Sequence, residues 1–167
     1  QYTLLGLTQF ATVSEVTLMN DLLDQSSRAS VDSYAELNTL ASTVDKLMTL
    51  ASTPNLSPGP QTVPSGTGLS VADLTAIGLT GVTTDNLNAI LAALAGTAND
   101  GSAMDTLTKL QAVADAAIAA QLSSLSNIST YAGSSSVASV GAAPTLSDFF
   151  SAGVVLNQPV SITSQSF

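Results

Sequence analysis

Cysteine and histidine are absent from the 167 residues, and only three Tyr and four Phe supply aromatic rings. Without thiols or imidazoles the chain cannot form disulfides, cannot use Cys or His in catalysis, and lacks the usual ligands of zinc and haem. An enzymatic site would have to be built from Asp, Glu, Ser, Thr, Tyr or Lys alone. The few rings also indicate a core of Leu, Ile, Val and closely packed Ala.

Basic residues are almost as scarce, since Arg28, Lys46 and Lys109 stand against twelve acidic residues and give a net charge of −9. Nucleic acids and anionic membranes both require clustered Lys and Arg, so the charge argues against either as a partner. No apolar run approaches the roughly 20 residues that span a bilayer, and no signal-peptide pattern is visible. The 45% apolar fraction nevertheless suffices for one domain or two small ones.

Helix starts are announced by a Ser or Thr placed three residues before an acidic residue, the spacing at which the two side chains can cap a helix N-terminus. Apolar stripes at helical spacing follow them, for example Val16, Met19 and Leu23. The pattern predicts a mainly α protein with helices over about 12–26, 33–52, 70–77, 87–96 and 107–126. The capping pairs are Thr12–Glu15, Ser33–Glu36, Ser70–Asp73, Ser102–Asp105 and Thr145–Asp148.

An internal repeat of about 70–75 residues underlies these helices. LLGLT at 4–8 resembles AIGLT at 76–80, and SVADLTAIGL at 70–79 resembles TLSDFFSAGV at 145–154. The last helix repeats the apolar spacing of the second at a constant offset: 37 to 107, 40 to 110, 44 to 114, 47 to 117 and 48 to 118. We therefore expect two quasi-repeated helical hairpin units, followed by the start of a third.

These observations divide the chain into four segments. Residues 1–53 form a first unit that is incomplete at its start, 54–69 a Pro/Gly-rich connector, and 70–132 a second unit. Residues 133–167 combine a Ser/Gly linker, a partial third unit and an extended tail, whose alternating VSITSQSF resembles an edge strand.

The repeat is out of phase with both ends of the sequence. One unit lacks its first element and a spare short helix lies at 144–154, so we expect neighbouring copies to complete one another head to tail. Such a contact uses different surfaces on the two partners and generates a ring or an open filament. The alternative is that the sequence is a window cut from a longer array of repeats.

Assembly contacts are expected from large apolar side chains near the two ends, because rigid rings contribute most per residue to an interface. Phe149 and Phe150 stand out, since Leu74 and Thr75 at the matching positions are smaller. The alternative for each ring is that it fills a local gap in the core. The candidate assembly residues are Tyr2, Leu4, Leu5, Phe10, Phe149, Phe150, Val154, Val155 and Phe167.

Calcium is the one cofactor for which the sequence offers candidate ligands, namely Asn99, Asp100 and Asp105. They lack the D-x-D-x-D-G spacing of calcium loops, and a turn followed by a helix cap explains them more simply. Lys109 lies four residues after Asp105, the spacing of an ordinary surface ion pair, so it is not a candidate catalytic base. We predict no enzymatic activity and no other cofactor.

GLTGVTTDNLNAILAAL at 78–94, followed by DTLTKLQAVADAAIAA at 105–120, resembles helical repeats of very large bacterial surface proteins. These adhesin-like, biofilm-associated chains are often carried by type 1 secretion, and the resemblance covers about 70–120 best. It implies an extracellular, non-enzymatic role in adhesion, spacing or assembly, and the absence of thiols is compatible with export. We predict a structural subunit of a filament or surface layer whose partners are copies of itself, with other cell-surface components as further candidates. The alternatives are a binding or spacer module of a giant adhesin and, third, a secreted enzyme.

Overall fold

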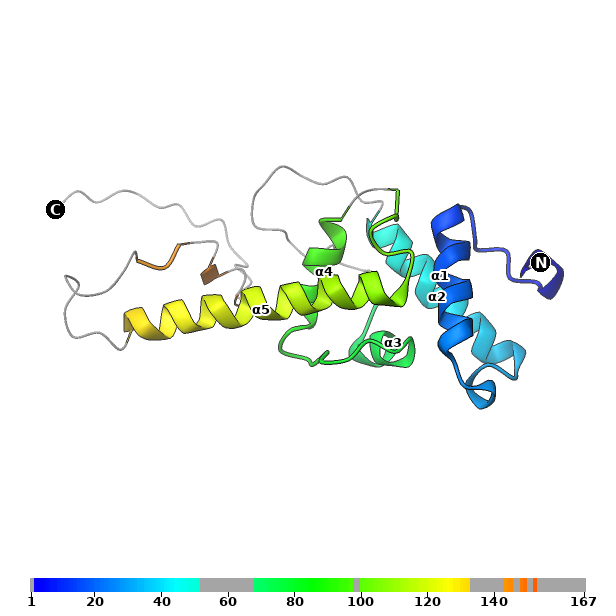
Figure 1. Cartoon of the computed structure of the whole chain (residues 1–167), viewed down its shortest axis with the longest axis horizontal. Coiled ribbons are helices and arrows are strands. Elements are labelled where there is room, and N and C mark those ends of the chain that lie inside the picture. The colour runs from blue at the N-terminus through cyan, green and yellow to red at the C-terminus, as the bar shows by residue number, and fades with distance from the viewer. Residues whose placement is uncertain are drawn as a thin grey trace.

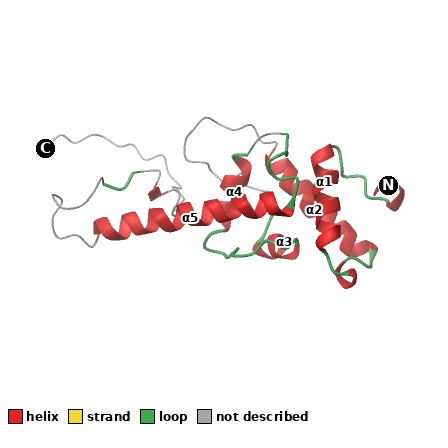
Figure 2. Cartoon of the chain, viewed as in Figure 1, coloured by secondary structure: helices red, strands yellow, loops and turns green. Residues whose placement is uncertain are grey.

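The protein is mainly α-helical. A computed structural model describes residues 2–51, 68–97, 100–132, 143–145, 148–149 and 152, and no strand occurs among them (Figure 2). Much of the connector and of the tail therefore lies outside the described residues. The helices are α1 Val13–Gln25, α2 Tyr34–Ala51, α3 Val71–Ala76, α4 Leu87–Ala95 and α5 Leu107–Ala132, with short 3-10 helices η1 Tyr2–Leu5 and η2 Arg28–Ser30.

The predicted N-terminal caps of the first three α-helices are present. Thr12 and Glu15 form a reciprocal capping box at α1, in which the hydroxyl accepts from the Glu15 N–H and the carboxylate accepts from the Thr12 N–H. Ser70 and Asp73 do the same at α3, and the Ser33 N–H donates to Glu36 before α2. Each cap satisfies backbone donors that a helix start leaves unpaired.

The first turn of α5 differs from the prediction. Ser102 donates to the Asp100 carboxylate rather than capping with Asp105, and the Thr106 hydroxyl accepts from the Lys109 N–H instead. Helix α5 starts at position 107 and α2 at position 34, whereas the apolar pattern relates each position of α2 to the position 70 residues later. The two helix starts are therefore three positions farther apart than the apolar pattern predicts. Since three positions are close to one full helical turn, this shift changes the buried face little, and the apolar pattern could not separate the two offsets.

A second correction concerns the buried face of α1. Leu18, Met19 and Leu22 are buried, whereas Val16 of the predicted stripe lies at the surface. The capping carboxylate of Glu15 is itself buried, so the face that it shares with Leu18 and Leu22 turns inward.

The turns that end η1 and α3 have the same hydrogen bonds. Gly6 N–H donates to the Thr3 carbonyl and Leu7 N–H to the Tyr2 carbonyl; Gly78 N–H donates to Thr75 and Leu79 N–H to Leu74. Both glycines have positive φ, +80° and +97°, as the Schellman motif requires. The LLGLT and AIGLT stretches thus fold alike.

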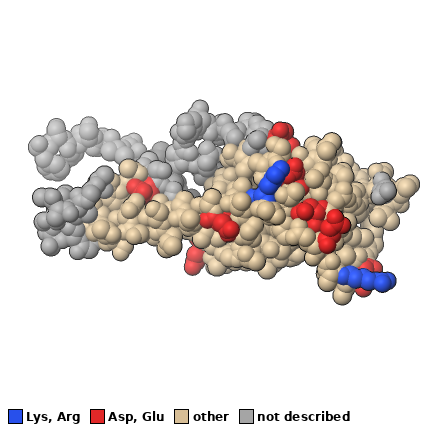
Figure 3. Space-filling view, in the orientation of Figure 1, with Lys and Arg blue, Asp and Glu red and all other residues tan. Residues whose placement is uncertain are grey.

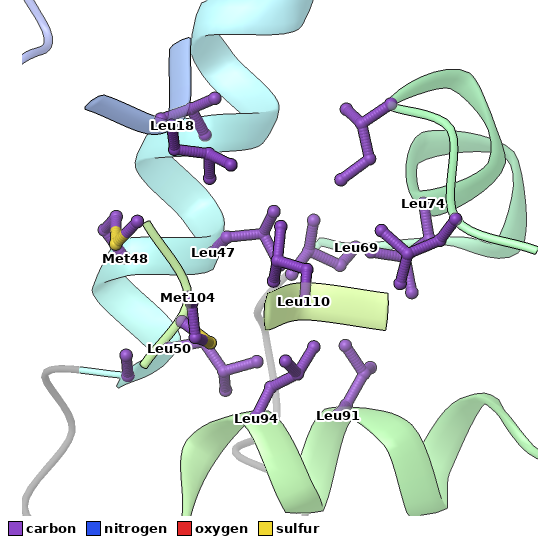
Figure 4. Packing of buried hydrophobic residues seen from close by; sticks show 14 of the residues in the cluster. Leu18, Leu47, Met48, Leu50, Leu69, Leu74, Leu91, Leu94, Met104 and Leu110 are labelled. Carbon is purple, nitrogen blue, oxygen red and sulfur yellow. The ribbon is translucent and has the colours of Figure 1, made fainter. Parts of the chain in front are cut away.

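The buried apolar side chains form one cluster to which all five α-helices contribute. Figure 4 shows Leu47 of α2 and Leu110 of α5 close together, with Leu91 and Leu94 of α4 on one side and Leu74 of α3 on another. Polar bonds also join the two halves of the chain, since Asp21 of α1 accepts the backbone N–H at the start of α5 at 2.7 Å. The two predicted units therefore share a core.

The molecule is elongated, with the N-terminal end and the free end of α5 at opposite ends of its long axis (Figure 1). The first half of α5 packs against α4, while its second half projects beyond the other labelled helices. None of the described helices is long and apolar enough to span a membrane.

Candidate assembly interface

Apolar side chains are left in solvent at the N-terminal end of the long axis. Leu4 and Leu5 of η1 are 91% and 54% exposed, and Val13 at the start of α1 is also exposed. A short 3-10 turn leaves room for only part of its side chains to face the protein, and here Leu7, just after it, enters the core. The two leucines are therefore available for contact.

A hollow of about 280 Å³ is lined in part by Tyr2 and Thr3 of the same 3-10 helix. The rings of Tyr2 and Phe10 meet with centroids 5.1 Å apart, and the Tyr2 hydroxyl donates to the Asn20 side chain. Burial, and secondly the carboxylate of Asp24, raise the pKa of Tyr2 because both disfavour the phenolate. The hollow is lined by Tyr2, Thr3, Leu7, Phe10, Val16 and Asn20.

At the other end, the projecting half of α5 carries Leu122 and Leu125, which are 68% and 47% exposed. The spacing from Ile118 to Leu122 to Leu125 is that of one helix face, and Ile118 packs at the edge of the core. An apolar stripe thus runs from the core onto the exposed part of the helix.

Phe149, at 38% exposure, belongs to a short helical turn next to this part of α5. The turn begins with the predicted cap, in which the Thr145 N–H and hydroxyl both donate to Asp148. These bonds lower the pKa of Asp148 because they favour its charged form. The side-chain amide of Gln121 in α5 donates to the Asp85 carbonyl at 3.0 Å and, more weakly, to the Ala152 carbonyl at 3.4 Å, so the turn contacts the helix.

Charge is nearly absent from both ends. Eleven of the twelve acidic residues and all three basic residues lie between positions 15 and 115, and Asp148 is the twelfth. On the face in Figure 3, most red and blue side chains lie over the packed helices rather than at the N-terminal end. Two copies of a chain with net charge −9 repel one another, but uncharged ends can meet with little desolvation cost.

The candidate assembly residues that the structure describes lie in two places, and the others lie outside the described residues. The structure brings Tyr2 and Phe10 together at the hollow, leaves Leu4 and Leu5 exposed on η1, and places Phe149 next to α5. The sequence prediction did not include Val16 and Asn20, although their i, i+4 spacing puts them on one face of α1, nor did it include Leu122 and Leu125. Phe150, Val154, Val155 and Phe167 lie outside the described residues.

The candidate calcium ligands have protein partners. Asp100 accepts from Ser102, and Asp105 forms the predicted ion pair with Lys109 at 2.6 Å. Asn99 lies outside the described residues, and within those that are described no three acidic side chains gather as a metal group would require. Hydrogen bonds from Ser102 lower the pKa of Asp100 because they favour its charged form.

Comparison of the chain with protein-family models, curated proteins and solved structures finds no significant match.

Proposed function

We propose that this protein is a structural subunit of an extracellular bacterial filament or surface layer, and that copies assemble head to tail through their two ends. The observation that carries the proposal is that exposed apolar side chains lie on the two elements that extend toward opposite ends of the long axis: Leu4 and Leu5 on η1, and Leu122 and Leu125 on the projecting half of α5. Because the two surfaces differ, each contact leaves a free surface at either end and the assembly can grow.

The proposal includes two quasi-repeated helical hairpin units, one with η1, α1 and α2, the other with α3, α4 and α5. In support, the turns after Gly6 and Gly78 share their hydrogen bonds. The caps at Ser70 and Thr145 also share theirs, as both donate from N–H and hydroxyl to an aspartate three residues on. The segment at 145–152 is then the start of a third unit.

Equivalent positions in the two units differ in burial, and the difference indicates which surface of the first unit a neighbouring copy could cover. Ile77 precedes its turn glycine as Leu5 does, but it is 4% exposed because it joins the core formed with the preceding unit, whereas Leu5 is 54% exposed. Burying a leucine side chain contributes about 1.5–3 kcal/mol. A second copy that covers the N-terminal end as the first unit covers α3 would gain about half of this stabilisation, because Leu5 is already partly buried.

An extracellular location is proposed from composition and resemblance. An acidic chain without thiols suits an oxidising environment outside the cell. The resemblance of 78–94 and 105–120 to repeats of secreted surface proteins is compatible with the same location.

A binding module of a surface adhesin is the second candidate, because the hollow has an aromatic rim and polar groups. Tyr2, Phe10 and Asn20 could contact a small carbohydrate there. Such a module would stay monomeric, so its prediction for the purified chain is opposite to that of the first proposal.

Electron microscopy and sedimentation of the purified chain test the proposal. We expect regular fibres or sheets, and expect Leu4→Ser combined with Leu5→Ser to reduce assembly. Ala76→Ser, at the exposed position of α3 that matches Leu4, is the control and should assemble normally. Dispersed monomers at all concentrations would contradict the proposal.

A further inference from the structure

Phe149 occupies a position that is buried elsewhere in the same chain. The helical turn that starts at Thr145 matches α3 over its hydrogen bonds: Phe149 N–H donates to the Thr145 carbonyl as Leu74 N–H does to Ser70. The bond from Ala152 to Asp148 likewise matches that from Ile77 to Asp73. Phe149 therefore corresponds to Leu74.

The side chain of Leu74 is completely enclosed by neighbouring side chains, which we call its socket. It is fully buried, and Figure 4 shows it beside Leu69 and near Leu47 and Leu110. Its surroundings thus come from two sources, the long helix of the preceding unit and the helices of its own unit. Phe149 has the first of these, α5, on which Gln121 holds the turn, yet the ring stays 38% exposed.

The hollow at the N-terminal end is the corresponding socket in the first unit, and the side chain of Tyr2 fills it only in part. Tyr2 is the counterpart of Leu74 in the first unit and accepts the same hydrogen bond at the end of its short helix, but Tyr2 is only half-buried. About 280 Å³ remains between its ring and the side chains of Leu7, Phe10 and Val16. A cavity of about 150 Å³ lined by apolar side chains accepts benzene, so the hollow has room for a phenyl ring.

We propose that the Phe149 ring of one copy inserts into the hollow beside Tyr2 and Phe10 of a second copy. This inference rests on the proposed head-to-tail assembly and names its central contact. The N-terminal segment and helix α1 of the second copy, which supply all the side chains that line the hollow, then complete the socket of Phe149. No charged residue lines the hollow, and the Asp148 carboxylate beside Phe149 is hydrogen-bonded by Thr145, so the ring itself enters an uncharged site.

Two variants separate the two sides of this contact. Phe149→Ser removes the inserted ring and leaves the hollow intact, whereas Val16→Trp fills the hollow and leaves Phe149 intact. Neither residue belongs to the buried core, so both variants should keep the helical circular dichroism of the parent chain. Phe149→Leu, which restores the residue found at position 74, is the conservative variant and should still assemble.

The experiment is analytical ultracentrifugation of each variant alone and of an equimolar mixture. We expect each single variant to remain a monomer, and the mixture to form a dimer that grows no further, because only one functional contact is possible. Polymers of Phe149→Ser, or a mixture that stays monomeric although the parent chain polymerises, would overturn the inference while leaving head-to-tail assembly standing. So would loss of assembly in Leu122→Ser with full assembly in Phe149→Ser. A parent chain that never polymerises would overturn both.

Discussion

Replacing Leu110 by Ala tests whether the two units fold as one body. Leu110 is fully buried near Leu47 of α2 and Leu94 of α4, so the substitution opens a cavity between the halves of the chain (Figure 4). Leucine-to-alanine changes at such sites cost about 2–5 kcal/mol, and we expect about 3 kcal/mol here. For a chain of this length that corresponds to a melting temperature lower by about 6–12 °C.

The assay is thermal and urea unfolding followed by circular dichroism, with Leu122→Ala as the matched control. Leu122 lies on the same helix but is largely exposed, so its substitution should change the stability by no more than about 0.5 kcal/mol. With a shared core, the Leu110 variant should shift a single cooperative transition. Two separate transitions, with the first helical unit unfolding at the midpoint of the unmodified chain, would refute the argument that the two units share one apolar cluster.

Two further predictions concern single turns. Gly78→Ala places a Cβ on a residue with φ of +97° and within 3.1 Å of the Leu107 side chain, so the free energy of unfolding should fall by about 1–2 kcal/mol in denaturation experiments. Gly96→Ala is the control, because Gly96 has φ of −81°, and its free energy of unfolding should fall by less. Equal losses would contradict the reasoning. The pKa of Asp73 is lowered mainly by its hydrogen bond from the Ser70 hydroxyl, so this bond stabilises the fold at neutral pH and the contribution is lost as the pH falls below about 4. Asp73→Asn should therefore flatten the acid side of the stability profile, and an unchanged profile would exclude this carboxylate as a contributor.

The helix starts could be predicted where no neighbouring side chain competes for the hydrogen bonds of the capping pair. Thr12 and Glu15 are such a pair, and their reciprocal bonds fix the first turn of α1. At α5 the prediction failed because Asp100 attracts Ser102 and Lys109 attracts Asp105, which leaves the cap to a neighbouring threonine. Local bonds of similar strength compete there, and a spacing pattern does not rank them.

The candidate interface could be predicted only in part. Large apolar residues near the ends could be named from the sequence, but their exposure depends on which elements pack over them, as the contrast between Leu5 and Ile77 illustrates. The hollow combines Tyr2 with Val16 and Asn20 from a different element, and it depends on the rotation of α1 about its axis. The buried Glu15 carboxylate sets that rotation, and the apolar stripe alone indicated another.

Sedimentation velocity of the unmodified chain over a wide range of concentration is the most direct test of head-to-tail assembly. Contact between unlike ends predicts a series of species that lengthens with concentration and has no preferred size. A single monomeric species throughout, or a dimer that stops growing, would contradict the account.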